Sequence, residues 1–143
     1  MQVKIKKVSP DAVMPAFVTE GAACFDLTCV GAENLGGGLY KMHTGLAFEI
    51  PKGYVGLLYP RSSIYKTGAV LANSVGVIDS DYRGEVCAMF AIANTERWAA
   101  QGDLKGTRIA QMMIRKLDDI ELVEAEELST TNRGAGGFGS TGR

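Results

Sequence analysis

The chain has 143 residues, of which 46% are hydrophobic and 22% charged, enough for one domain with a proper core. Its formal net charge of −1 provides no basic field for a nucleic-acid duplex, so no nucleic-acid partner is expected. The sequence begins without an apolar signal segment and contains no apolar run of about 18 residues, so we expect an intracellular protein without a membrane partner. The expected location is the cytoplasm, or the nucleus if the source is eukaryotic or viral.

The predicted elements are short strands. In chain order they are 3–8, 25–30, 46–50, 54–59, 85–93, 107–117 and 120–123, with one short helical turn near 62–67. Two of these segments are rich in Met and Ala, so periodicity alone also permits helices there. Frequent glycines and turn dipeptides, with strands recurring about every ten residues, favour an all-β sandwich, barrel or jelly roll.

The cysteines and the single histidine suggest little metal chemistry. Cys24, Cys29 and Cys87 form no CxxC pair, and they fit reduced, mostly buried thiols better than disulfides or a zinc site. His43, between Met42 and Thr44, is most simply interpreted as an ordinary strand residue.

Residues 71–85 contain the most specific indication of catalytic chemistry in the sequence. Two apolar stretches flank a polar tip, which predicts a hairpin, and Asp79 and Asp81 would share one face of an extended chain with Tyr82 on the other. A carboxylate at a strand end can act as a general base on water. The same Asp-Ser-Asp run is also good turn chemistry, so both interpretations stay open.

The segment 59–68 indicates an anion site. Arg61 is followed by Ser62 and Ser63 at a predicted helix start, which brings together a guanidinium, two hydroxyls and unpaired amides. A simple serine cap beside a surface arginine is the alternative.

Three further segments are weaker. Asp26 stands between apolar neighbours, and Gln111 lies in an apolar strand, where its amide needs partners. The last eleven residues, 133–143, are glycine-rich but carry an aromatic, two arginines and a Ser-Thr pair, which suits an arm folding over a nucleotide. A frayed terminus has the same composition. The familiar glycine motifs of phosphate loops are absent.

Taken in order, these five segments resemble the five motifs of the homotrimeric dUTPases, the dUTP nucleotidohydrolases. The strongest matches are Gly76-Val-Ile-Asp-Ser-Asp-Tyr-Arg-Gly84 and Arg133-Gly-Ala-Gly-Gly-Phe-Gly-Ser-Thr-Gly142. The resemblance implies a β jelly-roll domain over 1–130 and a flexible arm over 131–143, assembled as a homotrimer with shared active sites. It also implies Mg²⁺-assisted hydrolysis of dUTP to dUMP and pyrophosphate, which limits uracil incorporation into DNA and supplies dUMP.

The resemblance assigns roles by matching positions. Asp79 would be the general base that activates the attacking water, and Asp26 would hold Mg²⁺ through a water. The positions implied to bind the phosphates are Arg61, Ser62, Ser63 and Gln111, and those implied to read the uracil are Asn73 and the main chain of Gly76, Val77 and Ile78. Tyr82 would pack on the deoxyribose. The arm would contribute Arg133, Phe138, Gly139, Ser140 and Thr141, with Phe138 stacked on the base.

Three positions depart from the family pattern. Cys24 stands where glycine is usual, Ile64-Tyr65 replace Leu-Ala, and Thr107 takes the place of an acid. Two alternatives remain: a dCTP deaminase, a fold relative that shares the Arg-Ser-Ser segment, and an interaction protein whose arm responds to dUTP.

Overall fold

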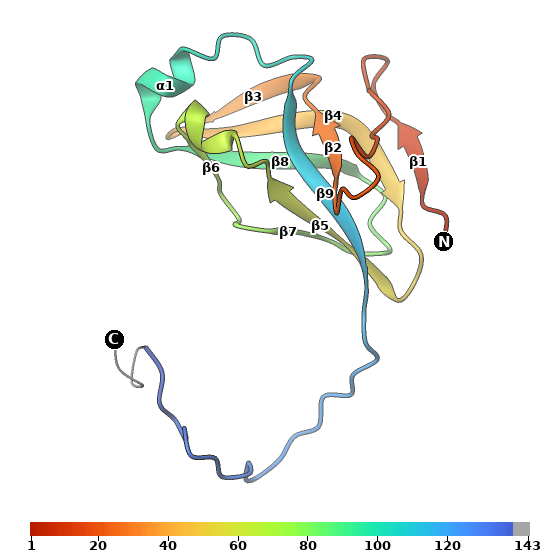
Figure 1. Cartoon of the computed structure of the whole chain (residues 1–143), viewed down its shortest axis with the longest axis vertical. Coiled ribbons are helices and arrows are strands. Elements are labelled where there is room, and N and C mark those ends of the chain that lie inside the picture. The colour runs from red at the N-terminus through yellow and green to blue at the C-terminus, as the bar shows by residue number, and fades with distance from the viewer. Residues whose placement is uncertain (139–143) are drawn as a thin grey trace.

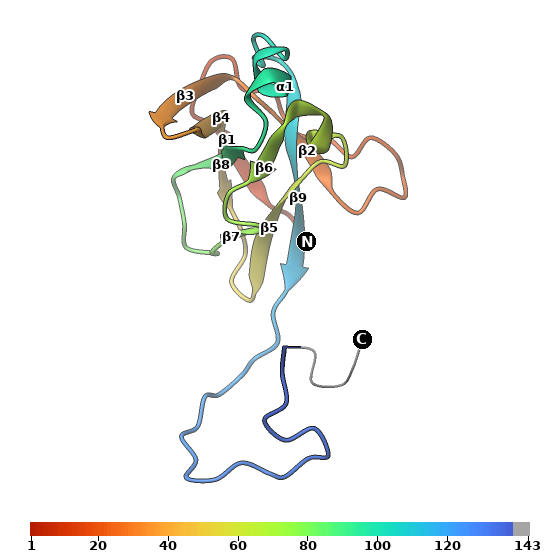
Figure 2. The same cartoon turned by 90° about the vertical axis from the view of Figure 1, so that its left-hand side faces the viewer.

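The structure is a computed structural model that describes residues 1–138. Two antiparallel sheets face each other in a jelly-roll-like sandwich that does not close into a barrel (Figures 1 and 2), which confirms the predicted all-β class. The first sheet has the order β1-β4-β8-β6, with β3 also paired to β4, and the second has the order β2-β9-β5-β7. The strands are β1 (Lys4–Lys7), β2 (Phe25–Thr28), β3 (Gly31–Gly36), β4 (Leu39–Glu49), β5 (Tyr54–Pro60), β6 (Ala69–Leu71), β7 (Gly76–Ile78), β8 (Glu85–Ile92) and β9 (Arg108–Lys116).

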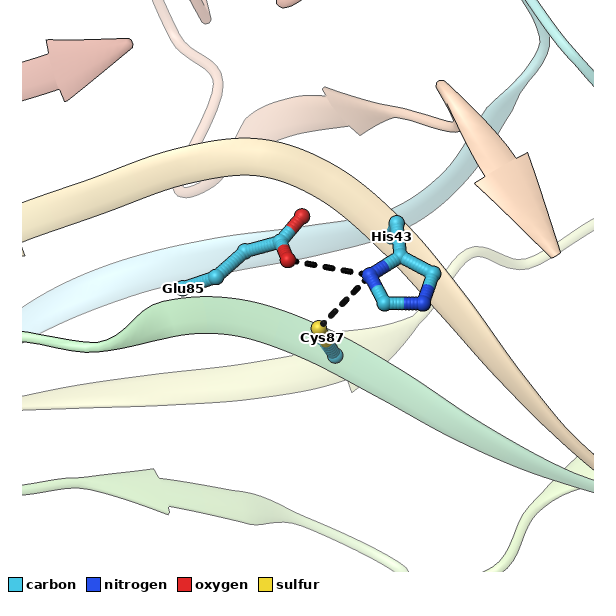
Figure 3. Close-up of side chains that lie close together, drawn as sticks. All are labelled: His43, Glu85 and Cys87. Atoms are coloured by element: carbon cyan, nitrogen blue, oxygen red, sulfur yellow. Dashed lines mark hydrogen bonds and ion pairs between the residues drawn. The ribbon is translucent and has the colours of Figure 1, made fainter. Parts of the chain in front are cut away.

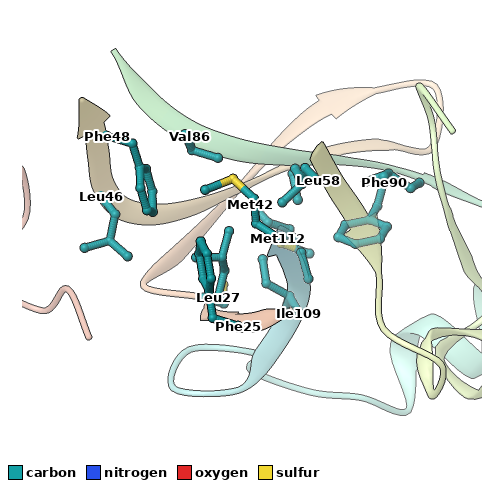
Figure 4. Packing of buried hydrophobic residues seen from close by; sticks show 14 of the residues in the cluster. Phe25, Leu27, Met42, Leu46, Phe48, Leu58, Val86, Phe90, Ile109 and Met112 are labelled. Carbon is teal, nitrogen blue, oxygen red and sulfur yellow. The ribbon is translucent and has the colours of Figure 1, made fainter. Parts of the chain in front are cut away.

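Both ambiguous segments are strands, and alternating burial explains this for β8. Along β8 every second residue from Val86 to Phe90 is buried, which is the period of a strand with one face on the core. A helix over the same residues would spread these apolar side chains around its circumference. Side chains from both sheets meet between them, with Phe48 and Phe90 among the largest that are fully buried (Figure 4).

Gly45 marks a bend in β4, where the neighbour on one edge changes from β3 to β1. The pairing of β4 with β8 slips between His43 and Ala47, and Gly45 lies in this gap with φ +68°. A Cβ at Gly45 would come within 2.8 Å of Ser9 Cβ and 2.9 Å of Ala12 Cβ. Only glycine fits both the left-handed conformation and this contact.

Both helices are single turns. The helical turn predicted near 62–67 is the 3₁₀ helix η1 (Ile64–Thr67), whereas the α-helix α1 (Thr95–Ala99) was not predicted. Asn94 begins α1 by accepting a hydrogen bond from the Arg97 amide at 2.9 Å. Five residues are too few to show a helical period, which is why the sequence did not reveal α1. Among the described residues no helix is long and apolar enough to cross a membrane.

One strand prediction was wrong, and one pair of strands was largely missed. Residues 120–123 form no strand, and their apolar side chains are strongly exposed: Ile120 79%, Leu122 91% and Val123 74%. β3 and the first half of β4 were missed because glycines 36–38, each with positive φ, make the turn between them look like a loop. After β9 the chain leaves the β body (Figures 1 and 2), and 117–138 contain neither helix nor strand.

Candidate active site

Asp26 is the centre of a charged cluster on the second sheet. It lies on β2, its side chain is 13% exposed, and its two oxygens accept from different arginines. Arg61 donates from Nε to Oδ1 at 2.9 Å, and Arg108 donates from Nη1 to Oδ2 at 2.9 Å. The cluster carries two positive charges against one negative, so it can attract an anion.

Strand register explains why these residues meet. On β9, Gln111 lies opposite Asp26 of β2 and also opposite Tyr59 of β5, so Arg61 follows β5 at this end of the sheet. The Gln111 side chain donates from Nε2 to the Pro60 carbonyl at 2.9 Å. That bond satisfies its half-buried amide and fixes the strand end from which Arg61 extends.

Sequence reasoning missed Arg108. It is the first residue of β9, and its guanidinium reaches Asp26 while Arg61 donates to its carbonyl at 3.3 Å. A single arginine at the start of an apolar strand is ordinarily an exposed end residue, so the residue type alone did not indicate a place in the site. Only the pairing of β2 with β9 reveals the contact.

The two serines after Arg61 lie exposed in the turn that precedes η1. Ser63 occupies the N-cap position, but its side chain makes no capping hydrogen bond. The turn is closed by the backbone, with the Ile64 amide donating to the Arg61 carbonyl at 3.0 Å. The capping alternative therefore does not account for Ser63, and an incoming anion can meet both hydroxyls beside the arginines.

Asp79 and Tyr82 line a separate cavity of about 400 Å³. The Tyr82 amide donates to the Asp79 carbonyl at 3.2 Å, which closes a turn, and the Tyr82 hydroxyl donates to the Glu85 carbonyl at 3.0 Å. Gly84 lies directly under the Tyr82 ring, where a Cβ would collide with it. The glycine therefore allows the ring to lie flat along this wall of the cavity.

The predicted hairpin over 71–85 is wrong. β6 pairs with β8 in the first sheet, whereas β7 pairs with β5 in the second, so the segment crosses between the sheets. Asp79 and Asp81 are consequently turn-region residues rather than alternate residues of a strand. The crossing is decided by which sheet buries each apolar stretch, and that information is not local.

Asn73 and β7 lie at the edge of the second sheet. Within 1–138, β7 pairs only with β5, so its outer backbone edge faces away from the sheet. Asn73 is exposed in a tight turn, in which its carbonyl accepts from the Val75 amide at 2.6 Å. Gly76 packs against Leu58, whose Cβ would lie 3.0 Å from an added Cβ.

Within a single chain, Asp79 lies far from the Asp26 cluster. In the β5–β7 register Ile78 lies opposite Gly56, which puts Asp79 beside Val55, while Asp26 aligns with Tyr59 through Gln111. Four residues along an antiparallel strand span about 13 Å. The candidate base and the candidate anion cluster therefore lie toward opposite ends of the same sheet.

The arm makes only local contacts among its described residues. Arg133 donates from Nε to the Gly136 carbonyl at 2.8 Å, and Phe138 is fully exposed. Gly139, Ser140 and Thr141 lie outside the described residues. The arm roles therefore stay predictions, as does the boundary at residue 130.

The three departures from the family pattern are accommodated. Thr107 donates to the Leu104 carbonyl at 2.6 Å, and Tyr65 is exposed with the Lys66 ammonium 5.9 Å from its ring centre. Burial, and then the charge of Asp26, raise the pKa of the half-buried Cys24 thiol, which therefore stays protonated.

Comparison with known proteins decides the family. The dUTPase family model matches residues 11–142. The chain belongs to the dUTPase family. The deoxyuridine 5′-triphosphate nucleotidohydrolase of Nautilia profundicola is 44% identical over 145 residues and covers 100% of both chains. That of Wolinella succinogenes is 41% identical and covers 100% of this chain and 95% of its own.

Solved structures agree with the family. The dUTPase of Staphylococcus bacteriophage 80alpha with dUpNHpp superposes with a TM-score of 0.85 over 99% of each chain, at 28% identity. A mutant dUTPase of the S. aureus phage phi11, 25% identical with a TM-score of 0.75 over 89% of this chain and 98% of its own, is described with a structural Mg(II) ion. The predicted family and fold are confirmed, and the dCTP deaminase alternative is not favoured.

Proposed function

We propose that this chain carries out the dUTP hydrolysis of its family in sites shared between the subunits of a homotrimer. The observation that carries this proposal is the separation of Asp79 from the Asp26 cluster within one chain. Water attack on phosphorus requires base and phosphate ligands around one reacting atom. A second chain that brings its Asp79 cavity against the Asp26 cluster satisfies that requirement.

The Asp26 cluster is the phosphate side of the proposed site. Arg61 and Arg108 supply charge, and Ser62 and Ser63 supply hydroxyl donors. Asp26 holds both guanidinium groups in place, so they are positioned before the substrate arrives. Stabilisation by preorganised charge is what phosphoryl-group chemistry chiefly needs from a protein.

Asp26 is suited to binding a magnesium ion through one of the waters that the ion coordinates. Both of its oxygens already accept from arginines, and direct coordination of a metal would compete with those bonds. Each oxygen can accept a further hydrogen bond from a metal-bound water, and Mg²⁺ retains several waters in most protein sites. Bound Mg²⁺ would neutralise part of the triphosphate charge.

Asp79 is the proposed general base and the Tyr82 cavity is the nucleoside side. The Asp79 carboxylate is exposed at the cavity, so it can hold the attacking water and take its proton. The outer edge of β7 offers backbone donors and acceptors to the uracil, and Tyr82 forms a wall against the sugar. The arm, through Arg133 and Phe138, would close over this nucleotide.

Exposed apolar residues in the segment after β9 support the assembly. Ile120, Leu122 and Val123 are exposed in the single chain at 79%, 91% and 74%. Three neighbouring apolar side chains in water favour burial against another surface. A neighbouring subunit of the trimer supplies such a surface.

The reaction is tested by pyrophosphate release from dUTP, dCTP, dTTP and UTP in the presence of Mg²⁺. We expect dUTP to be cleaved far faster than the other nucleotides, and Asp79→Asn to lose at least about a hundredfold in kcat. Asp81→Asn, which alters the neighbouring exposed carboxylate, is the matched control and should retain activity. An unchanged rate in Asp79→Asn would refute the assignment of the base.

Mixed trimers test whether each active site is shared between two chains. Asp79→Asn and Arg61→Ala chains, each inactive alone, are unfolded together, refolded at equal amounts and assayed. If each site takes Asp79 from one chain and Arg61 from its neighbour, roughly a quarter of the sites are intact and activity returns to that level. If both residues act from one chain, every site lacks one of them and the mixture stays inactive.

A further inference from the structure

Three potential metal ligands meet on the first sheet, outside the Asp26 cluster. His43 on β4 and Cys87 on β8 are direct cross-strand partners, and Glu85 lies two residues before Cys87, on the same face. The His43 Nδ1 atom lies 2.9 Å from Glu85 Oε2 and 3.6 Å from Cys87 Sγ (Figure 3). All three ligand atoms lie within 4.8 Å of one another.

We propose that His43, Glu85 and Cys87 bind one divalent transition-metal ion of the zinc class. Tetrahedral zinc, with bonds of about 2.0 Å to nitrogen and oxygen and about 2.3 Å to sulfur, holds its ligand atoms roughly 3.3–3.5 Å apart. The two separations from Nδ1 bracket this range, and the third pair of ligand atoms lies within 4.8 Å, so small side-chain adjustments would complete three corners. A thiol and an imidazole select zinc or cobalt over Mg²⁺.

Surrounding groups orient the ligands. The Gly45 amide donates to Glu85 Oε1 at 2.6 Å, which leaves Oε2 facing His43. On the far side of the ring, Glu33 Oε2 lies 3.8 Å from His43 Nε2, beyond hydrogen-bond distance, but its negative charge favours a proton on Nε2 and so leaves Nδ1 as the metal-binding nitrogen. A carboxylate behind a ligating histidine commonly supports such sites by orienting the ring.

The charge of the ligands and the access to the site are also compatible with a bound dication. A thiolate and a carboxylate together carry two negative charges, which one dication neutralises. The Cys87 thiol would release its proton when it binds the metal, because the thiolate is the ligand form. Glu85 and Cys87 line the cavity of about 400 Å³, through which an ion and its fourth ligand, a water, can enter.

The site is independent of the proposed magnesium role. It lies on β4 and β8 of the first sheet, whereas Asp26 lies on β2 of the second. Its expected effect is to join β4 to β8 beside the Gly45 bend, and it adds no step to the hydrolysis. Binding to the folded state alone raises stability in proportion to the logarithm of metal concentration over the dissociation constant.

Cobalt titration of the purified full chain, followed by absorption, tests the proposal. We expect one Co²⁺ per chain, thiolate-to-cobalt charge-transfer absorption, tetrahedral d–d bands, and displacement by Zn²⁺ but not by excess Mg²⁺. Cys87→Ser should lose the charge-transfer band, His43→Ala should weaken Co²⁺ binding at least tenfold, and Glu33→Gln should weaken it about tenfold with the band retained. Cys24→Ser, which removes a thiol of similar exposure, is the control and should titrate like the parent.

Melting curves complete the test. Zn²⁺ should raise the melting temperature of the parent and of Cys24→Ser, but not that of Cys87→Ser or His43→Ala. Curves in chelator establish that the variants fold. Absence of charge-transfer absorption in the parent, or its persistence in Cys87→Ser, would overturn the proposal.

Discussion

Asp26 joins two arginines that are 47 residues apart in the sequence, and its 2.9 Å contact with Arg61 links β2 to the end of β5. Because the carboxylate is 13% exposed, its charge is poorly solvated by water and depends on the guanidinium groups. The same contact sets the position of Arg61, which the proposed function assigns to phosphate binding. Under that proposal, stability and substrate binding are coupled at one side chain.

Replacing Asp26 by Asn should weaken both properties. The amide cannot neutralise Arg61 and Arg108, and we expect a loss of about 2 kcal/mol in unfolding free energy, together with a raised KM for dUTP. Urea denaturation at fixed protein concentration measures the first and steady-state kinetics the second. Asp11→Asn breaks an exposed pair with Lys105 and should change neither. Equal effects in the two variants would contradict the special position of Asp26.

Gly84→Ala should disturb the cavity proposed to bind the nucleoside. The added methyl collides with the Tyr82 ring, so the ring must move, and overpacking of this kind costs about 1–3 kcal/mol. We expect poorer discrimination between dUTP and UTP, measured as the ratio of their kcat/KM values. Gly21→Ala has open space around the new methyl and is the matched control. Unaltered discrimination in Gly84→Ala would show that the position of the Tyr82 ring does not determine specificity.

Leu122→Ser should weaken the proposed trimer rather than the fold of the β body. Leu122 is 91% exposed in the single chain, so a polar residue costs nothing there unless a partner covers it. Sedimentation at decreasing concentration should show the variant dissociating before the parent. Lys116→Ser, at the end of β9, is a control that should sediment like the parent. A trimer of parental stability in Leu122→Ser would show that this side chain stays in water.

The edge strand β1 should depend on pH through Glu49. Hydrogen bonding from Lys4 at 2.8 Å, and then the charge of Lys4, lower the pKa of Glu49 below its usual 4.5. A lowered folded-state pKa stabilises the protein above 4.5, and that contribution disappears as the pH falls through the folded value. Both groups are exposed, so the effect is small and is screened by salt.

The Glu49 contribution can be isolated by denaturation of the parent and Glu49→Gln at pH 7 and at pH 3. We expect a small stability difference at pH 7 that shrinks at pH 3 and in high salt. A difference that is independent of pH would assign the effect to packing instead.

Prediction from sequence worked where signals were local. The strands near β1, β2, β5, β8 and β9 follow from apolar spacing and turn residues, and the family follows from five ordered motifs. Ser62, Ser63 and Asn73, which the family resemblance assigned to the site, lie in the structure as exposed turn residues. Their roles in binding stay predictions until the variants are assayed.

The all-β class, the family and the residue types at the candidate site follow from the amino-acid sequence, because these depend on period, turn chemistry and motif order. Tertiary structure alone decided that 71–85 crosses between sheets, that Arg108 reaches Asp26, and that His43 meets Glu85 and Cys87. Each of these depends on strand pairs distant in sequence. Their register is set by which faces are buried together, and no local pattern encodes that choice.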